Sequence, residues 1–174
     1  MMKTSAILMT QNGFDKARAE LARKIIELQE ICAERLLAHG LSGDGWHDNP
    51  YFNRLQQLEA EKTRDIANVQ ALINQTRLIA IDPARRPMVT VGIGAVVTFT
   101  IFYQERPDEV TQTWEIVGFN ESDAGLGQLA YNSPLGSAIM GLAVGEDAEM
   151  VLPGGAANVE ILELSNQRYS CPQS

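Results

Sequence analysis

The side chains best suited to chemistry gather in one short segment, residues 39–52. This segment holds both histidines of the chain, His39 and His47, and two aspartates four residues apart, Asp44 and Asp48. The spacing allows both carboxylates to lie on one side of a short loop, where their charge would attract a divalent cation. Each aspartate also has a structural explanation. Asp44 lies between two glycines, as turn residues often do, and Asp48 directly precedes a helix start, where the helix dipole favours negative charge.

Other catalytic patterns are weak or missing in the sequence. With only two histidines, both near the aspartates, no Ser–His–Asp order is found, and no Cys/His cluster has the spacing of a zinc site. Gly92-Ile93-Gly94 resembles part of a dinucleotide-binding loop, but no strand–loop–helix unit follows it. Ser133 stands before Pro134 and is interpreted as a helix cap and not as a nucleophile.

The charge balance argues against general binding to nucleic acid. The 174 residues include 22 Asp or Glu and 14 Lys or Arg, which gives a formal net charge of −8. Proteins that hold DNA or RNA by the phosphates do so with clustered basic residues. This acidity fits better with a basic protein partner or a metal-assisted site.

Cysteine usage and hydropathy indicate a cytoplasmic protein. Cys32 and Cys171 are the only cysteines, and two thiols so far apart do not suggest a disulfide framework. We expect both thiols to be inert. The sequence shows neither a secretory signal nor an apolar run long enough to cross a bilayer.

The first half of the chain has the pattern of two helices. Residues 11–40, with Thr10 as a candidate N-cap, contain no proline and carry apolar side chains at intervals of three and four. A second stripe follows Asn49-Pro50, where Asn can cap a helix and Pro can take its first position. We expect helices near 11–40 and 50–80 to pair as an antiparallel coiled-coil hairpin, because nothing else nearby could cover the stripes. The first stripe is Phe14, Ala17, Leu21, Ile25, Leu28, Cys32 and Leu36; the second is Leu55, Leu58, Ile66, Val69, Ile73 and Thr76, with polar Lys62 in its seam.

The second half has the pattern of a small α+β domain. Two prolines mark residues 82–88 as a linker between an N-terminal hairpin, residues 1–81, and a C-terminal domain, residues 89–174. A short helix is predicted from Ser133-Pro134 through Met140, ended by Gly141. Segments rich in Val, Thr, Ile and aromatic residues predict an antiparallel sheet. Its strands are expected at 89–103, 111–117, 125–131, 149–152 and 158–164.

Several motifs resemble the Gre family of transcription elongation (transcript-cleavage) factors, of the GreA/GreB type. The strongest is the run NSPLGSAIMGLAVGE at residues 132–146, followed by PGG at 153–155 and a terminal strand ending ILEL at 161–164. IGAVVT at 93–98 and WEIVG at 114–118 fall in the family's order, and Met9-Thr10 with Gly13, Arg18 and Leu21 resembles the family's opening. The resemblance covers nearly the whole chain and is stronger in the second half.

This resemblance implies a division of labour. In the family, the hairpin enters the secondary channel of bacterial RNA polymerase, and an FKBP-like C-terminal domain docks at the outer rim. Acidic residues at the hairpin tip help to hold the second catalytic Mg²⁺ and orient a water, so that the polymerase's own active site cleaves backtracked RNA. The chain is therefore expected to be an accessory factor without a cofactor of its own. It would meet the RNA 3′ end indirectly and would bind neither membranes nor specific DNA sequences. The predicted polymerase-binding residues are Asn132, Ser133, Pro134, Leu135 and Gly136.

The tip departs from the family pattern. Gly43-Asp44 and Asp48-Asn49 can be aligned with the family's Gly-Asp and Glu-Asn, so the resemblance assigns to Asp44 and Asp48 the catalytic assistance and the shared Mg²⁺. One extra residue separates the two acids, however, and Tyr51-Phe52 stands where Glu-Tyr is expected.

Three further residues near the tip are candidate RNA contacts: Arg35, Trp46 and Arg54. For the two arginines the alternative is that they are ordinary exposed helix charges. An indole at a hairpin tip has no core to join, so Trp46 would either pack back over Phe52 or insert against the polymerase or a base. His47 is a candidate metal or phosphate contact, or a solvated loop residue.

Three functions remain open at this point. The first is transcript cleavage. The second is a Gre-like protein that occupies the secondary channel and modulates or inhibits synthesis without cleavage, which the altered tip motivates. The third is a peptidyl-prolyl isomerase, because the second domain should be FKBP-like; the few aromatic residues there, several at alternating strand positions that suit the core, disfavour it.

Overall fold

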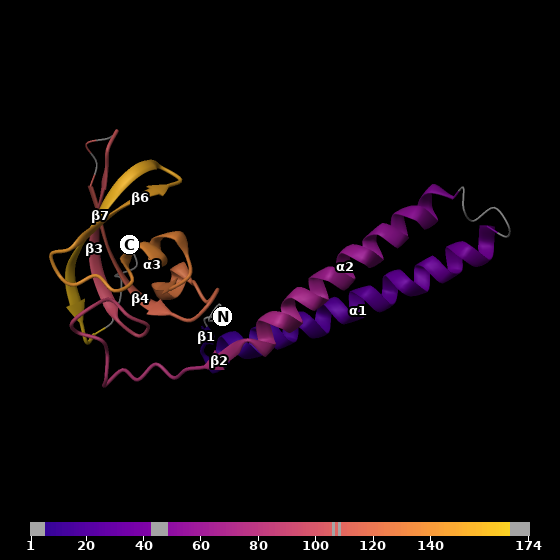
Figure 1. Cartoon of the computed structure of the whole chain (residues 1–174), viewed down its shortest axis with the longest axis horizontal. Helices are drawn as coiled ribbons and strands as arrows, with labels where there is room; N and C mark the ends of the chain where they lie inside the picture. The colour runs from indigo at the N-terminus through magenta and orange to yellow at the C-terminus, as the bar shows by residue number, and fades with distance from the viewer. Residues whose placement is uncertain (1–5, 43–48, 106, 108, 168–174) are drawn as a thin grey trace, which may run out of the picture. The chain divides into compact units, whose positions relative to one another are not determined.

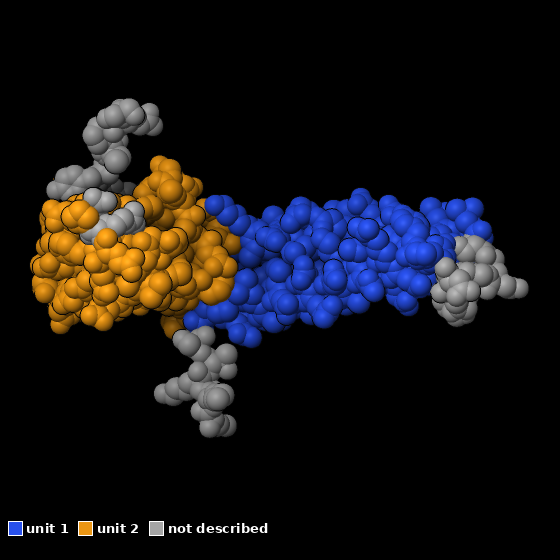
Figure 2. Space-filling model, turned by 90° about the horizontal axis from the view of Figure 1, so that it is seen from above, with its two compact units in different colours: residues 1–7, 14–76 blue, residues 8–13, 77–174 orange. Residues whose placement is uncertain are grey.

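A computed structural model describes residues 6–42, 49–105, 107 and 109–167. The chain divides into two compact units, coloured blue and orange in Figure 2. Unit 1 comprises Met1–Ile7 and Phe14–Thr76, and unit 2 comprises Leu8–Gly13 and Arg77–Ser174. The division lies ahead of the predicted linker 82–88, and it assigns a short N-terminal segment to the second unit. No helix in the described ranges is long and apolar enough to cross a membrane.

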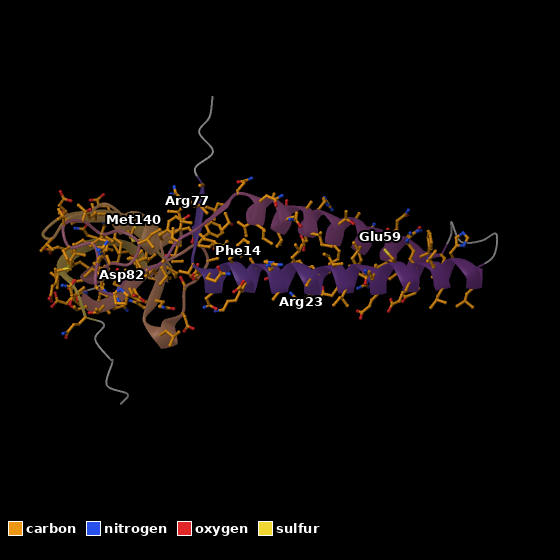
Figure 3. All side chains as sticks on the ribbon, turned by 90° about the horizontal axis from the view of Figure 1, so that it is seen from below. Phe14, Arg23, Glu59, Arg77, Asp82 and Met140 are labelled. Atoms are coloured by element: carbon orange, nitrogen blue, oxygen red, sulfur yellow. The ribbon has the colours of Figure 1, made fainter. Side chains whose placement is uncertain are left out.

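Two long antiparallel helices lie side by side, as Figures 1 and 3 show. Helix α1 spans Gln11–Ser42 and helix α2 spans Pro50–Asn74. Both predicted caps are present. The Thr10 hydroxyl accepts a hydrogen bond from the Gly13 amide at 3.3 Å, and the Asn49 side chain accepts from the amides of Tyr51 at 3.0 Å and Phe52 at 3.4 Å. The predicted helical hairpin is confirmed.

Helix α2 ends earlier than the apolar stripe predicts. Thr76–Leu78 forms strand β2, which pairs with strand β1, Ile7–Met9, in a small two-stranded sheet. The Ile7 amide donates to the Gln75 carbonyl at 3.1 Å. The expectation of a helix to residue 80 was therefore wrong at its end. A distant strand supplies backbone partners there, and helical periodicity within 50–80 carries no information about that strand.

The interface between α1 and α2 alternates apolar contacts with ion pairs. Near its tip end, Phe52 and Leu55 pack on Ala38 in a small cluster joined by Ile31 and Leu58. Further along, three ion pairs cross from helix to helix: Arg35–Glu59 at 2.5 Å, Lys24–Asp65 at 3.2 Å, and Glu27–Lys62. Lys62 therefore fits the seam because a carboxylate on α1 faces it.

The face of α1 that meets α2 differs from the predicted stripe at two positions. Leu36 and Ile25, both predicted in the seam, are 67% and 39% exposed. Their places are taken by Arg35 and Lys24, whose charged groups pair with acids on α2. The purely apolar stripe was wrong at these positions, because long basic side chains can lie along an interface and still reach a carboxylate.

Unit 2 is built on a five-stranded sheet in the order β5-β4-β3-β7-β6. The strands are β3 Val96–Tyr103, β4 Glu109–Val117, β5 Gln128–Ala130, β6 Asp147–Leu152 and β7 Gly155–Ser165. The short helices are η2 Ala124–Leu126 and α3 Pro134–Ile139. The α+β fold class is confirmed.

Two details of the predicted sheet require correction. The pairings β3–β4, β3–β7 and β6–β7 are antiparallel, but β4–β5 is parallel, since residues 118–127 carry the chain back before β5 begins. The strand expected at 89–103 starts only at Val96, because a turn precedes it: Gly94 has φ 87°, and the Ala95 amide donates to the Gly92 carbonyl at 3.0 Å.

The hydrophobic core of unit 2 lies on one face of this sheet, under α3. Phe99, Ile116, Ile139 and Ile161 are its largest fully buried members. Helix α3 contributes Ile139 and lies against β6. This core fixes the position of α3 and therefore of the predicted binding run at its start.

Arg86, which the sequence places in the linker, is buried. Its side chain is 4% exposed and that of Glu115 on β4 is 2% exposed. The guanidinium donates to the Glu115 carboxylate at 2.7 Å and to the Gly94 carbonyl at 2.6 Å, and Gln128 donates to the same carboxylate at 3.2 Å. The end of the linker is thus part of the packed sheet.

Replacing Arg86 by Met should lower the free energy of unfolding by about 3–5 kcal/mol, because it leaves the buried Glu115 carboxylate without its cation. Urea denaturation of the full chain measures this change. The matched control is Arg85→Met, whose side chain is 88% exposed and whose loss should cost less than about 0.5 kcal/mol. Equal effects of the two substitutions would contradict the structural role of the Arg86–Glu115 pair.

Candidate functional site

The predicted tip residues Asp44, Trp46, His47 and Asp48 lie outside the described residues. The structure describes the helix ends on either side of them. Helix α1 ends at Ser42, and α2 begins at Pro50 behind its cap, Asn49. The two aspartates therefore belong to the segment that connects the two helices, as predicted from the sequence.

Phe52 is the anchor of the described tip. Its side chain is 3% exposed, the Arg35 guanidinium lies 5.9 Å from its ring centroid, and the His39 ring lies 6.0 Å away. An aromatic ring held by an apolar cluster, a cation and an imidazole has a packing role. It fixes the distance between the two helices close to the connecting segment.

Arg35 takes part in the hairpin interface. Its side chain is 28% exposed and pairs with Glu59 of α2 while lying over Phe52. A structural role is therefore visible for Arg35, whereas the predicted contact with RNA stays a prediction. Arg54, the other candidate, is exposed on α2.

Tyr51 and Phe52, which replace Glu-Tyr of the family pattern, both contact α1. The Tyr51 hydroxyl donates to the Glu34 carboxylate at 3.1 Å, and this hydrogen bond raises the pKa of Tyr51. Tyr51 thus brings a neutral group where the family pattern has an acid. Any carboxylate chemistry in the connecting segment must come from Asp44 and Asp48.

Cys32 lies in the same interface, next to Glu59. Removal from water raises the pKa of the Cys32 thiol, and the neighbouring Glu59 carboxylate adds to the effect. A thiol with a raised pKa is a poor nucleophile at neutral pH. Cys171, the second cysteine, lies outside the described residues.

The predicted polymerase-binding run forms the start of α3. Ser133 is its N-cap, as predicted: the hydroxyl accepts from the Gly136 amide at 3.0 Å and donates to the Ala130 carbonyl at 2.8 Å. Gly136 is buried against the same carbonyl, and a Cβ there would lie 2.2 Å from it. Leu135 packs on the core, whereas Pro134 is exposed. The run therefore combines residues that shape the turn with one that is free to contact a partner.

Asn132 joins this run to the loop at 118–121. Its side chain accepts from the Asn120 amide at 2.8 Å and donates to the Asn120 side chain at 2.8 Å. Asn120 has φ 56°, a left-handed conformation that Asn tolerates better than most residues. Asn120 was not among the predicted site residues, because nothing in its local sequence indicates a partner twelve residues later.

Metal-ligating side chains are not gathered elsewhere in the described ranges. No group of three or more His, Cys, Asp and Glu residues is placed to hold a metal ion among the residues outside 1–5, 43–48, 106, 108 and 168–174.

The family model described as "Transcription elongation factor, GreA/GreB, C-term" matches residues 86–166. Transcription elongation factor GreA of Clostridioides difficile (strain 630) is 30% identical over 165 residues, covering 94% of this chain and 99% of that protein. The chain belongs to the GreA/GreB family. Transcription elongation factor GreA of Bacillus licheniformis is 28% identical over 166 residues, covering 95% of this chain and all of that protein.

Among solved structures, GreA factor homolog 1 (Gfh1) of Thermus thermophilus aligns with 92% of this chain and 99% of its own, at 17% identity and a TM-score of 0.42. That likeness is too distant to inform function. The match at 86–166 includes the start of α3, where the predicted polymerase-binding residues lie.

A substitution pair tests whether Arg35 is structural. Arg35→Met should lower the free energy of unfolding by about 1–3 kcal/mol, because it leaves an enclosed Glu59 oxygen without its cation. Arg35→Met with Glu59→Met should restore stability to within about 1 kcal/mol, since two apolar side chains can replace an ion pair. Urea denaturation followed by helical circular dichroism measures both. An additive loss in the double variant would contradict the assignment.

Gly136→Ala tests the shape of the α3 turn. The added methyl group would collide with the Ala130 carbonyl, so we expect a loss of about 1–3 kcal/mol in the free energy of unfolding. Ser137→Ala, an exposed position on the same helix, should change stability by less than about 0.5 kcal/mol. A harmless Gly136→Ala would mean that Gly136 is not needed for packing.

Proposed function

We propose that this chain binds bacterial RNA polymerase through the secondary channel and stimulates cleavage of backtracked RNA by the polymerase active site. Family membership supports the partner, and one observation carries the rest. Two long antiparallel helices are joined by a segment that contains Asp44 and Asp48. In this view the chain is an accessory factor, and the bond-breaking groups belong to the polymerase.

The chemistry open to the connecting segment is that of carboxylates. Mg²⁺ prefers hard oxygen ligands and keeps part of its water shell, so Asp44 and Asp48 have the right donor type to share an ion with another protein. A divalent ion placed there would stabilise charge on the attacked phosphate and on the attacking water. Phe52 and the Arg35–Glu59 pair hold the ends of α1 and α2 together next to the connecting segment.

The start of α3 is the proposed contact with the channel rim. Pro134 is exposed at the first position of the helix, and Asn132 and Ser133 fix the turn before it. Ser133 and Gly136 act within the turn itself, so we assign them to shaping the surface and Pro134 to contact.

In a second candidate function, the chain binds the same channel of the polymerase but does not stimulate RNA cleavage. The observation that favours it is the changed tip. Tyr51 brings a hydrogen-bonded phenol where the family pattern has an acid, and the two aspartates are one residue further apart than the family's acids. Such a protein would occupy the channel and modulate synthesis.

Cleavage of stalled complexes tests the proposal. With purified polymerase and 5′-labelled RNA, the wild-type chain should shorten the RNA from its 3′ end. Asp44→Asn and Asp48→Asn keep the side-chain shape but remove the charge, so each should slow cleavage about a hundredfold, or about 2.7 kcal/mol of barrier. The half-saturating concentration should stay the same, because binding is spread over the rest of the chain.

Asp147→Asn is the matched control, because Asp147 is an exposed acid at the start of β6 and its loss should leave cleavage unchanged. A wild-type chain that competes for the channel but never shortens RNA at saturating Mg²⁺ would establish the second function. Full cleavage by the Asp44→Asn, Asp48→Asn double variant would remove both residues from the mechanism.

A further inference from the structure

Residues 8–13, which include the first residues of α1, belong to unit 2 and are hydrogen-bonded within it. The Phe119 amide donates to the Leu8 carbonyl at 2.8 Å, and the Ile79 amide donates to the Met9 carbonyl at 2.8 Å. Met9 is buried, with 2% of its surface exposed. The first turn of α1 is therefore packed with the loop at 118–121, in the same compact unit.

Glu121 makes the decisive contacts in this loop. One oxygen of its carboxylate accepts from the Thr10 amide at 2.7 Å, and the other accepts from the Thr10 hydroxyl at 2.6 Å. The same hydroxyl accepts from the Gly13 amide and so caps α1. Hydrogen bonds to a charged acceptor are stronger than neutral ones, and a negative charge at a helix N-terminus is favoured by the dipole. Glu121 thus fixes both the cap and the residue that carries it.

Two glycines make room for this carboxylate. A Cβ at Gly13 would lie 2.2 Å from the Glu121 oxygen, and a Cβ at Gly118 would lie at the same distance. Glycine weakens a helix relative to alanine, so Gly13 in the first turn of α1 needs another reason. Space for the Glu121 side chain provides that reason.

We infer that Glu121 is a positioning residue: by holding Thr10, it fixes the N-cap and the first turn of α1 within unit 2. Helix α1 continues from this anchored turn to the segment that carries Asp44 and Asp48. Replacing Glu121 removes the hydrogen-bond acceptor from this turn and should lower the cleavage rate while Asp44 and Asp48 stay unchanged. The catalytic consequence rests on the proposed function, whereas the anchor itself does not.

Hydrogen exchange at the Thr10 amide tests the anchor in the full chain. Glu121→Ala should accelerate this exchange about tenfold to a hundredfold. That factor corresponds to the free energy of one hydrogen bond to a charged group. Glu121→Gln keeps one carbonyl acceptor and should give an intermediate rate. Wild-type exchange in Glu121→Ala would overturn the inference.

A double-mutant cycle tests whether the missing Cβ at Gly13 makes room for the Glu121 carboxylate. Gly13→Ala should accelerate Thr10 exchange in the wild-type chain, because the methyl group displaces the carboxylate. In the Glu121→Ala background the same substitution should have no further effect, since the obstacle is gone. Gly40→Ala is the control on the same helix, where a Cβ meets nothing within 4 Å. Equal effects of Gly13→Ala in both backgrounds would overturn the inference.

The rate of RNA cleavage distinguishes a positioning role of Glu121 from a role in stability alone. At saturating protein, Glu121→Ala should cleave on the order of tenfold to a hundredfold more slowly, a loss that a substitution far from the reacting atoms can cause. Its half-saturating concentration should stay within about twofold, because neither the Asn120–Asn132 hydrogen bonds nor the α3 cap involves the Glu121 side chain. Glu121→Gln should recover part of the rate. An unchanged saturating rate would overturn the positioning role. If the wild-type chain does not cleave, the proposed function fails, and the exchange measurements alone decide the anchor.

Discussion

Within unit 1, helices α1 and α2 have only each other to pack against in the described residues, and this interface governs what the unit can do. Two helices alone bury little apolar surface, so charged side chains must share the seam. Arg35, Lys24 and Lys62 do so by pairing with acids on the opposite helix. Charged seam pairs also set register, since a shift along the helix would separate each cation from its carboxylate. Register in turn determines where the connecting segment lies.

Unit 2 differs from unit 1, because its sheet has a full hydrophobic core and its proposed binding surface is a turn. The start of α3 is shaped by backbone contacts: Ser133 caps the helix, and Gly136 allows it to approach the Ala130 carbonyl. Arg86 brings the linker into the same structure through Glu115. Residues that are chemically unreactive therefore determine the shape of the surface offered to a partner. The one exposed residue in the predicted binding run, Pro134, depends on them for its position.

The charged residues with a proposed chemical role and those that stabilise the fold lie in different segments of the chain. The two carboxylates proposed to share Mg²⁺ belong to the connecting segment, whereas most described charged groups near it are engaged in the helix interface. After Lys62 the chain contains no lysine, so its acidity is concentrated in the second half. An acidic second half favours basic protein surfaces and disfavours phosphate backbones. Both features suit a protein that assists another catalyst.

The sequence by itself determined the features that depend on neighbours along the chain. These were the two helices, their caps at Thr10 and Asn49, the α3 cap at Ser133, and the family. It also identified Asp44 and Asp48 as the carboxylates of the tip segment, because no structure is needed to count them. Only the tertiary structure decided that Arg35 and Lys24 take the places of Leu36 and Ile25 between the helices. It also decided why α2 stops at Asn74, that Arg86 is buried, and that Glu121 holds Thr10. Each of these depends on a partner far away in sequence, and the partner's position exists only once the chain has folded.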